Sequence, residues 1–301
     1  MRFHHAIGLW CCAFAFCSAR PTLAQTIQNP LGVRMMVSTD DTQPVLWVVV
    51  PGHPDSDHAI RLLLPEHVTG RRQSKTDAEH LYVFRPGQQG EPPVWRKNDR
   101  SLEYEREFAG GVHFHASATL EDDGIRVTYT FVNRSDAPFE MIYAVTDPRM
   151  GPPFRDVRLE RTYVHHKEGF DLLASETPQR LTMPLSQWLP ARYLASYMWP
   201  VPTKRAEKRD DNITYYNKSR AVDMPLVATL SEDRKWVVAS FTNAVGNVWS
   251  NPELTCQHVD PSVALAPGES KSIEVKILIF PGTLDQVLKK VKEQRSTLKS
   301  E

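Results

Sequence analysis

Apolar and polar side chains alternate along much of the chain, as they do in antiparallel β-strands with one face in a core and the other in water. In residues 101–108, SLEYEREF, apolar residues alternate with three glutamates. Residues 112–120 and 125–133 repeat this alternation on either side of the turn sequence Glu-Asp-Asp-Gly. The two segments and the turn between them predict a β-hairpin.

Other apolar segments, bounded by turn residues, recur at intervals of roughly ten residues. They are residues 139–147, 225–230, 235–243 and 272–280. The segment 44–50, PVLWVVV, is apolar almost throughout, which is typical of a strand buried on both faces. Helical periodicity does not interrupt this series. The pattern predicts an all-β fold, a large antiparallel β-sandwich.

Helical periodicity occurs near the C-terminal end, in residues 283–296. The apolar positions there are Leu284, Val287, Leu288 and Val291. Their i, i+3, i+4, i+7 spacing places them on one helix face. Thr283 and Gln286 match a capping box at the helix start. We therefore expect a C-terminal helix that packs on the sandwich.

The segment 178–225 differs in character, because it is rich in proline and aromatic residues. Loops of this length without secondary structure are uncommon in compact domains unless they serve a site. The segment is therefore interpreted as a functional cover or as a partly ordered excursion.

The first 24 residues have the pattern of a cleaved signal peptide. Arg2 precedes an apolar run, residues 6–17, that is too short to span a bilayer, and Ala24 is a small residue at the end of the segment. We expect residues 25–301 to form a single β-supersandwich domain that is secreted or periplasmic, with no membrane insertion after signal cleavage. Cys256 is the one cysteine of that part, so it has no internal disulfide partner.

Charge and motif content exclude several function classes. Residues 1–24 hold two of the 36 Lys and Arg and none of the 36 Asp and Glu, so the rest carries two more acidic than basic residues. A balance so close to neutral gives no electrostatic basis for binding nucleic acid. The sequence also lacks Gly-x-Gly-x-x-Gly and phosphate-loop motifs, so no organic cofactor is expected.

Two stretches carry a resemblance to a known family. The first is LEDDGIRVTYTFVNRSDAPFEMIYAVTDPRM, residues 120–150, and the second is residues 251–280, in which Cys-x-His-x-Asp-Pro precedes LAPGES and a closing strand. The chain resembles the galactose mutarotase-like (aldose epimerase-type) β-supersandwich family. It is most similar to secreted bacterial members of undefined function. The resemblance implies a scaffold that handles carbohydrates.

The same resemblance implies where an acid and a base would stand. The family's enzymes use a histidine acid in a His-Pro pair after the hairpin and a glutamate base in the late strand. In this chain the first position holds Asp147-Pro148 and the second falls near Thr255, with Glu253 two residues earlier. The scaffold is therefore expected without the usual mutarotase acid–base pair.

Cys256 and His258 are two residues apart, so on a strand they point to the same face. That is the geometry of a thiolate–imidazole pair, but a lone cysteine is also well suited to a buried apolar position. We interpret Cys256 as facing the core and His258, beside Asp260, as facing a ligand.

His113 and His115 form a second pair of this kind, and of the adjacent His165 and His166 only one can face the same way. With Asp147 or Asp260 such histidines suit a metal, but spacings such as His-x-Glu-x-x-His are missing. We therefore expect no metal and favour contact with a polyhydroxylated ligand.

Aromatic residues in the 178–225 segment, among them Tyr197 and Trp199, suit stacking on sugar rings or packing against the sandwich. Tyr163, His165 and Arg161 also match the residue types of a polysaccharide lyase.

These observations predict a secreted carbohydrate-binding protein, and they leave open the alternative of an aldose epimerase or polysaccharide lyase that uses rearranged residues. The candidate ligand-binding residues are His113, His115, Asp147, Arg149, His165, Tyr197, Trp199, Glu253, His258 and Asp260.

Overall fold

A computed structural model describes residues 25–38, 43–53, 56–85, 89–177, 191–209, 212–251 and 255–300. The expected signal peptide, residues 1–24, lies outside these ranges. Of the helices within them, none has the length and the apolar content that crossing a membrane requires.

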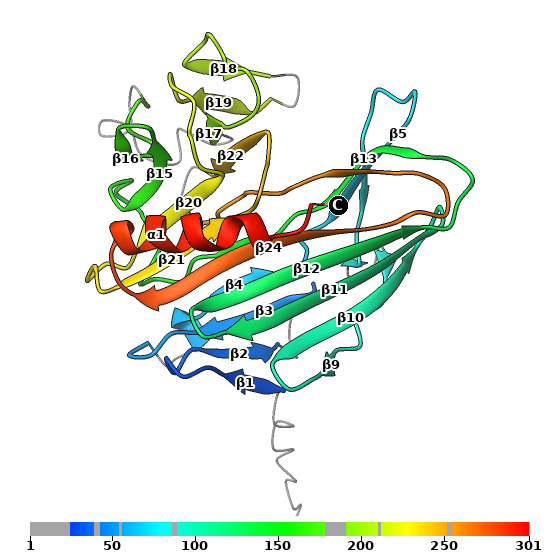
Figure 1. Ribbon diagram of the computed structural model, residues 1–301, viewed down its shortest axis with the longest axis horizontal. Helices are drawn as coiled ribbons and strands as arrows, with labels where there is room; N and C mark the ends of the chain where they lie inside the picture. The colour runs from blue at the N-terminus through cyan, green and yellow to red at the C-terminus, as the bar shows by residue number, and fades with distance from the viewer. Residues whose placement is uncertain are drawn as a thin grey trace, which may run out of the picture.

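The largest sheet in the described residues has nine antiparallel strands in the order β16-β15-β20-β21-β24-β12-β11-β10-β9. From one edge to the other these are Gly169–Leu172, Thr162–His166, Leu226–Leu230, Trp236–Phe241, Ser270–Pro281, Gly124–Asn133, Val112–Glu121, Ser101–Phe108 and Arg96–Lys97. The long strands β24, β12, β11 and β10 lie side by side in this sheet (Figure 1).

A five-stranded sheet, β1-β2-β3-β4-β14, forms the second layer. Its strands are Thr26–Gln28, Arg34–Val37, Val45–Val49, Ile60–Leu63 and Asp147–Arg149. A four-stranded sheet consists of β23 Val263–Leu265, β13 Phe139–Ala144, β5 Val68–Arg72 and β6 Glu79–Leu81. The short strands β7 Phe84–Arg85 and β8 Gln89–Gly90 pair with each other, and η1 is a single turn of helix, Ser56–His58.

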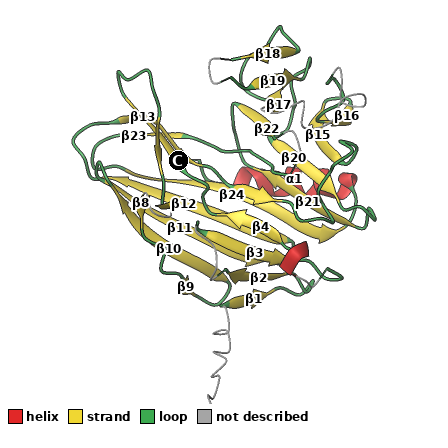
Figure 2. Ribbon diagram, turned by 180° about the vertical axis from the view of Figure 1, so that it is seen from behind, coloured by secondary structure: helices red, strands yellow, loops and turns green. Residues whose placement is uncertain are grey.

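One hydrophobic core joins the two main layers. Tyr129 and Phe131 of β12 are fully buried in the same cluster as Leu46 of β3 and Ile60 of β4. Both views of the ribbon place β3 and β4 alongside β11 and β12 (Figures 1 and 2). The expected all-β antiparallel sandwich is therefore confirmed. Along its strands, the alternation of side chains separates a face in the core from a face in solvent.

The predicted hairpin is β11 and β12, which pair from Val112 with Asn133 to Glu121 with Gly124. Gly124 has a φ of +151°, and a Cβ there would lie 2.0 Å from the carbonyl oxygen of Ile277 on β24. A glycine is therefore required where the turn passes close to the neighbouring strand.

The expected C-terminal helix is α1, Leu284–Gln294, followed by the short helix η3, Arg295–Thr297. Thr283 caps it with the predicted capping box to Gln286. Val287 and Val291 are fully buried in a second cluster, which includes apolar residues of β20, β21 and β24. The helix thus covers one face of that part of the large sheet, which Figure 1 shows in front of β24.

The described parts of the 178–225 segment contain strands joined by turns and irregular segments. The strands are β17 Ala191–Ser196, β18 Ala206–Lys208 and β19 Thr214–Asn217, which join β22 Asn247–Ser250 in a four-stranded sheet. The strands β17 and β19 pair in parallel, and Tyr193 stacks on Tyr216 across them, with 5.8 Å between ring centres. Figures 1 and 2 show this sheet above one end of the sandwich.

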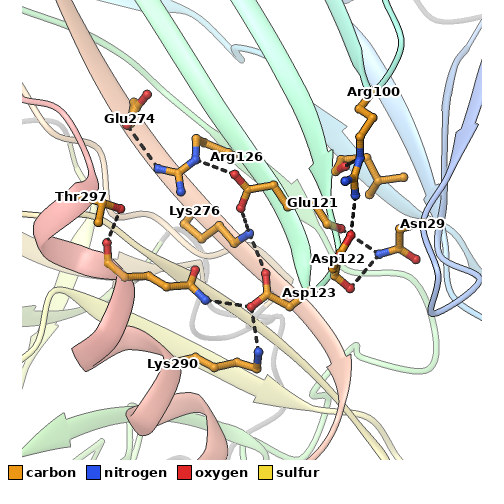
Figure 3. A network of polar contacts seen from close by, with 12 residues as sticks. Asn29, Arg100, Glu121, Asp122, Asp123, Arg126, Glu274, Lys276, Lys290 and Thr297 are labelled. Carbon is orange, nitrogen blue, oxygen red and sulfur yellow. Dashed lines mark hydrogen bonds and ion pairs between the residues drawn. The ribbon is translucent and has the colours of Figure 1, made fainter.

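A buried lysine ties the hairpin turn to β24 and α1 (Figure 3). Lys276 is fully buried, and its ammonium contacts the carboxylates of Glu121 and Asp123. Asp123 also accepts hydrogen bonds from Lys290 and Gln294 of α1, each 2.8 Å long. Although burial opposes ionisation, the charge of Lys276 and these hydrogen bonds hold the pKa of Asp123 well below its usual range.

Replacing Asp123 by asparagine is expected to lower the free energy of unfolding by about 3 kcal/mol near pH 7, because it leaves the buried Lys276 with one carboxylate fewer. Because the pKa of Asp123 is lower in the folded than in the unfolded chain, its stabilisation is present above about pH 4 and is lost as the pH falls further. Urea unfolding should therefore show the difference between wild type and D123N shrinking from pH 7 to pH 3.

The matched control is D122N, one residue away. Asp122 pairs with Arg100 at 2.6 Å, but both side chains are largely exposed, so its loss should cost less than about 1 kcal/mol. Equal costs for the two variants at pH 7 would contradict the buried network.

Candidate functional site

The strand β14 and the segment 255–260 bring a group of polar residues into the interior. Asp147 is the first residue of β14 and pairs with Leu63 of β4. The segment 255–260 is held on both sides, because Met150 donates its backbone N–H to Thr255 and His258 exchanges two backbone hydrogen bonds with Trp249 of β22. Two stretches more than a hundred residues apart therefore meet.

His258 lies at the centre of this group and is only 2% exposed. Its Nδ1 is 3.2 Å from Oδ2 of Asp260, and its Nε2 is 3.9 Å from Oδ1 of Asp147. The Trp249 ring stacks on the imidazole, with 3.8 Å between ring centres and 7° between planes. Burial opposes the charged form, but Cys256 and Asp260 raise the pKa of His258 well above its usual value.

Arg149 connects Asp147 to a further carboxylate. Its Nε donates to Oδ2 of Asp147 at 2.7 Å, and its Nη2 donates to Oε1 of Glu66 at 3.0 Å. Burial, followed by the charge of Asp147, raises the pKa of Glu66. We call the group of Asp147, Cys256, His258 and Asp260, with the partly exposed Glu66 at its edge, the buried polar cluster.

The buried polar cluster borders a cleft of about 470 Å³. The lining residues are Trp47, Asp57, Ala59, Arg61, Arg149, Met150, Gly151, Arg155 and Thr255. The Arg61 guanidinium lies over the ring of Trp47, 5.4 Å from its centre. Arg149 belongs to the cleft and to the cluster, so the two features share a wall.

No protein-family model and no curated protein sequence matches the chain. Several solved structures do. A galactose mutarotase-like protein from Lactobacillus casei is 11% identical, with 85% of this chain and 99% of that chain covered and a TM-score of 0.50. An aldose epimerase homologue from C. elegans is 9% identical over 86% and 98% of the two chains, with a TM-score of 0.48. An α-N-acetylgalactosaminidase from Bifidobacterium bifidum is 11% identical over 89% and 39%, with a TM-score of 0.49.

The first of these likenesses spans nearly the whole of a mutarotase-like chain, and it agrees with the layered antiparallel sheets. The chain has the galactose mutarotase-like fold. In this mutarotase-like fold the position expected for a His-Pro pair is Asp147-Pro148, which starts β14.

Four of the candidate residues from the sequence come together, namely Asp147, Arg149, His258 and Asp260. His258, expected to face a ligand, is instead buried beneath Trp249, because its segment pairs with β22. Cys256 is buried, in agreement with its interpretation as a residue that faces inward.

The other candidates lie elsewhere. His113 and His115 occupy the outer face of β11, close to Glu107 and Glu103. His165 pairs with Asp223 at 2.6 Å, beside Phe170. The structure brings none of these histidines to the buried polar cluster.

The aromatic candidates also stand apart from the cleft lining. Tyr197 accepts a hydrogen bond from Arg295 at 3.2 Å, and Trp199 is 61% exposed, with its ring against Gly246. Glu253 lies outside the described residues.

Sequence reasoning missed Glu66, Trp249 and the cleft residues Trp47, Arg61 and Arg155. Glu66 had a weak local signal, since the pair Glu66-His67 interrupts an otherwise apolar stretch. Burial, then the nearby His80, lowers the pKa of His67 to about 4, so this imidazole is neutral at pH 7.

The burial of Cys256 predicts that its thiol reacts slowly. In the full chain with Cys11, Cys12 and Cys17 replaced by serine, an aromatic disulfide reagent should label native Cys256 at least about 100-fold more slowly than the urea-unfolded chain, because reaction requires local opening. Labelling at the unfolded rate in buffer would contradict the buried position. The reaction is followed by absorbance, and circular dichroism confirms that the triple variant is folded.

Proposed function

We propose that the protein binds a carbohydrate in the cleft between Trp47 and Arg149 and that it is secreted or periplasmic. The observation that carries the proposal is the composition of the cleft: an indole ring and three guanidinium groups converge on a hollow of about 470 Å³. The mutarotase-like fold agrees with this proposal, and the apolar run in residues 6–17 supports export.

Each lining group suits one part of a sugar. The flat C–H face of a pyranose packs on an indole ring, while guanidinium N–H groups donate to hydroxyl, carboxylate or sulfate oxygens. Arg149 is held by Asp147 and Glu66, so its orientation is fixed before a ligand arrives. Preorganisation of this kind lowers the entropic cost of binding.

The charges of the lining favour an acidic saccharide over a neutral one. The cleft lining itself holds three arginines and a single aspartate, Asp57, and of the three Arg149 is already paired with Asp147 and Glu66 at the cleft wall. A uronate or a sulfated sugar would bring the negative charge that these arginines attract. We therefore infer uronate-containing saccharides as the ligand class.

A second candidate function, a carbohydrate-active enzyme, is favoured by one specific feature. Glu66, bound to the cleft residue Arg149, has a pKa that burial and the charge of Asp147 raise, which is the direction that a general acid requires. Its carboxyl group, rather than the usual pair, would move the proton in this alternative. Nuclear magnetic resonance of a bound sugar would reveal it as anomeric exchange or as an unsaturated product that disappears in E66Q.

Trp47→Ala and Arg61→Gln are each expected to weaken saccharide binding about tenfold, because each removes a contact worth roughly 1.4 kcal/mol. The ligand is first selected on an array of neutral and uronate-containing glycans, and its affinity is then measured by calorimetry. A galactose and galacturonate pair of equal chain length tests the charge preference, which should favour galacturonate.

The matched control is R220Q. Arg220 is exposed and paired with Glu168, and neither residue lines the cleft. Its affinity should equal that of the wild type. If no glycan on the array binds to the protein, the carbohydrate proposal fails. If W47A binds the selected saccharide as tightly as R220Q does, the proposal that binding occurs in this cleft fails.

A further inference from the structure

Three metal-binding side chains converge inside the buried polar cluster. Asp147, Cys256 and His258 each offer one ligand atom, and these atoms lie within 4.8 Å of one another. All three residues are buried, and in the part of the chain that the structure describes they form the one group of this kind. They come from β14 and from the segment 255–260, so the fold and not a local motif assembles them.

A carboxylate oxygen with no hydrogen bond points into this group. Asp147 is 2% exposed, and its Oδ1 accepts no hydrogen bond from the described residues. Its near neighbour is Nε2 of His258, at 3.9 Å, which is beyond hydrogen-bonding distance. A buried carboxylate oxygen left in this state is costly unless a cation or another donor meets it.

The remaining atoms of the ligand residues are already held in the orientation that metal binding needs. Nδ1 of His258 faces Oδ2 of Asp260 at 3.2 Å, which directs Nε2 toward the ligand group. Oδ2 of Asp147 accepts from Arg149 at 2.7 Å, and this leaves Oδ1 available. Asp260 is fixed in turn by the backbone N–H of Thr146, at 3.0 Å. Such outer partners are a regular feature of histidine and carboxylate metal ligands.

We propose that Asp147 Oδ1, Cys256 Sγ and His258 Nε2 bind one divalent transition-metal ion, zinc by the chemistry of the ligands. A thiolate, an imidazole and a carboxylate together suit zinc, whereas magnesium and calcium prefer oxygen ligands alone. Binding requires a small contraction, since ligand atoms around tetrahedral zinc are separated by roughly 3.4 Å. Three protein ligands leave a fourth position for water or another small ligand.

Charge balance supports a cation at this place. The titratable and charged groups beside the ligand residues are Asp260, which is nearly buried, and the partly exposed Glu66, His67 and Arg149. A metal ion binds His258 in its neutral form and displaces its proton, so a Cys256 thiolate and the carboxylates of Asp147 and Asp260 then exceed the positive charge of Arg149, and a divalent ion offsets the difference. The proposal stands apart from saccharide binding, because no step of it uses the cleft.

The test uses the full chain with Cys11, Cys12 and Cys17 replaced by serine, so that Cys256 is the single thiol. After dialysis against a weak chelator, elemental analysis should find one zinc ion per chain. Cobalt substitution should add a near-ultraviolet thiolate-to-metal absorption band and tetrahedral d–d bands. Zinc should also slow the alkylation of Cys256.

Variants separate this site from adventitious binding. C256S, H258Q and D147N should each lose the cobalt thiolate band or the bound zinc, and D260N should weaken zinc affinity about 10- to 100-fold through the orientation of His258. H166Q is the matched control, because His166 on β15 is an equally buried histidine, and its Nδ1 bonds to the carbonyl oxygen of Ala221. It should bind zinc like the wild type.

If the reference protein, with only the three cysteine-to-serine changes, takes up no zinc and shows no cobalt–thiolate band, the proposal is overturned, whether or not the further variants fold. Zinc uptake that survives in C256S with unchanged cobalt spectra overturns it as well, since the metal would then lie elsewhere. Saccharide binding by calorimetry is measured on the same samples, so that failure of the cleft and failure of the metal site are told apart.

Discussion

A charge that leaves water must be neutralised by groups that the fold itself brings within reach. This constraint shapes two regions of the sandwich that carry buried charge. At the hairpin turn, Lys276 is fully buried and its ammonium meets Glu121 and Asp123. In the interior, Asp147 and His258 lie side by side. In both places the partners are more than a hundred residues apart, so the chain can bury these charges only after its long-range strand pairing has formed.

The same constraint explains how much of the structure the sequence could predict. The hairpin of β11 and β12 and the capping box at Thr283 were predictable, because alternation and capping depend on residues that are close in sequence. The strands within 178–225 were not, since β17 and β22 form a sheet only across a distant connection. The contact of Arg149 with Glu66 likewise joins residues 83 positions apart, and no local pattern marks it.

The candidate site was predicted in part for the same reason. His258 and Asp260 stand two residues apart, so their pairing could be read from the sequence. The position of His258 beneath Trp249 depends on the bridge between β22 and the segment 255–260, which the sequence does not show. The resemblance places a histidine where Asp147 stands and a carboxylate near Thr255. In this chain a carboxylate, that of Asp147, occupies the histidine position. The imidazole is that of His258, three residues after Thr255.

Arg149 is the physical link between this cluster and the cleft. Its guanidinium holds Oδ2 of Asp147 and Oε1 of Glu66 while its side chain lines the cleft wall. An anionic ligand in the cleft that attracted this guanidinium would leave the negative charge of Asp147 less compensated. The buried polar cluster would then bind a cation more strongly. Thermodynamic linkage makes the effect reciprocal, so a cation in the cluster would strengthen the attraction of Arg149 for an anion in the cleft. One arginine would therefore couple the proposed saccharide site and the proposed metal site, although the two share no ligand atom.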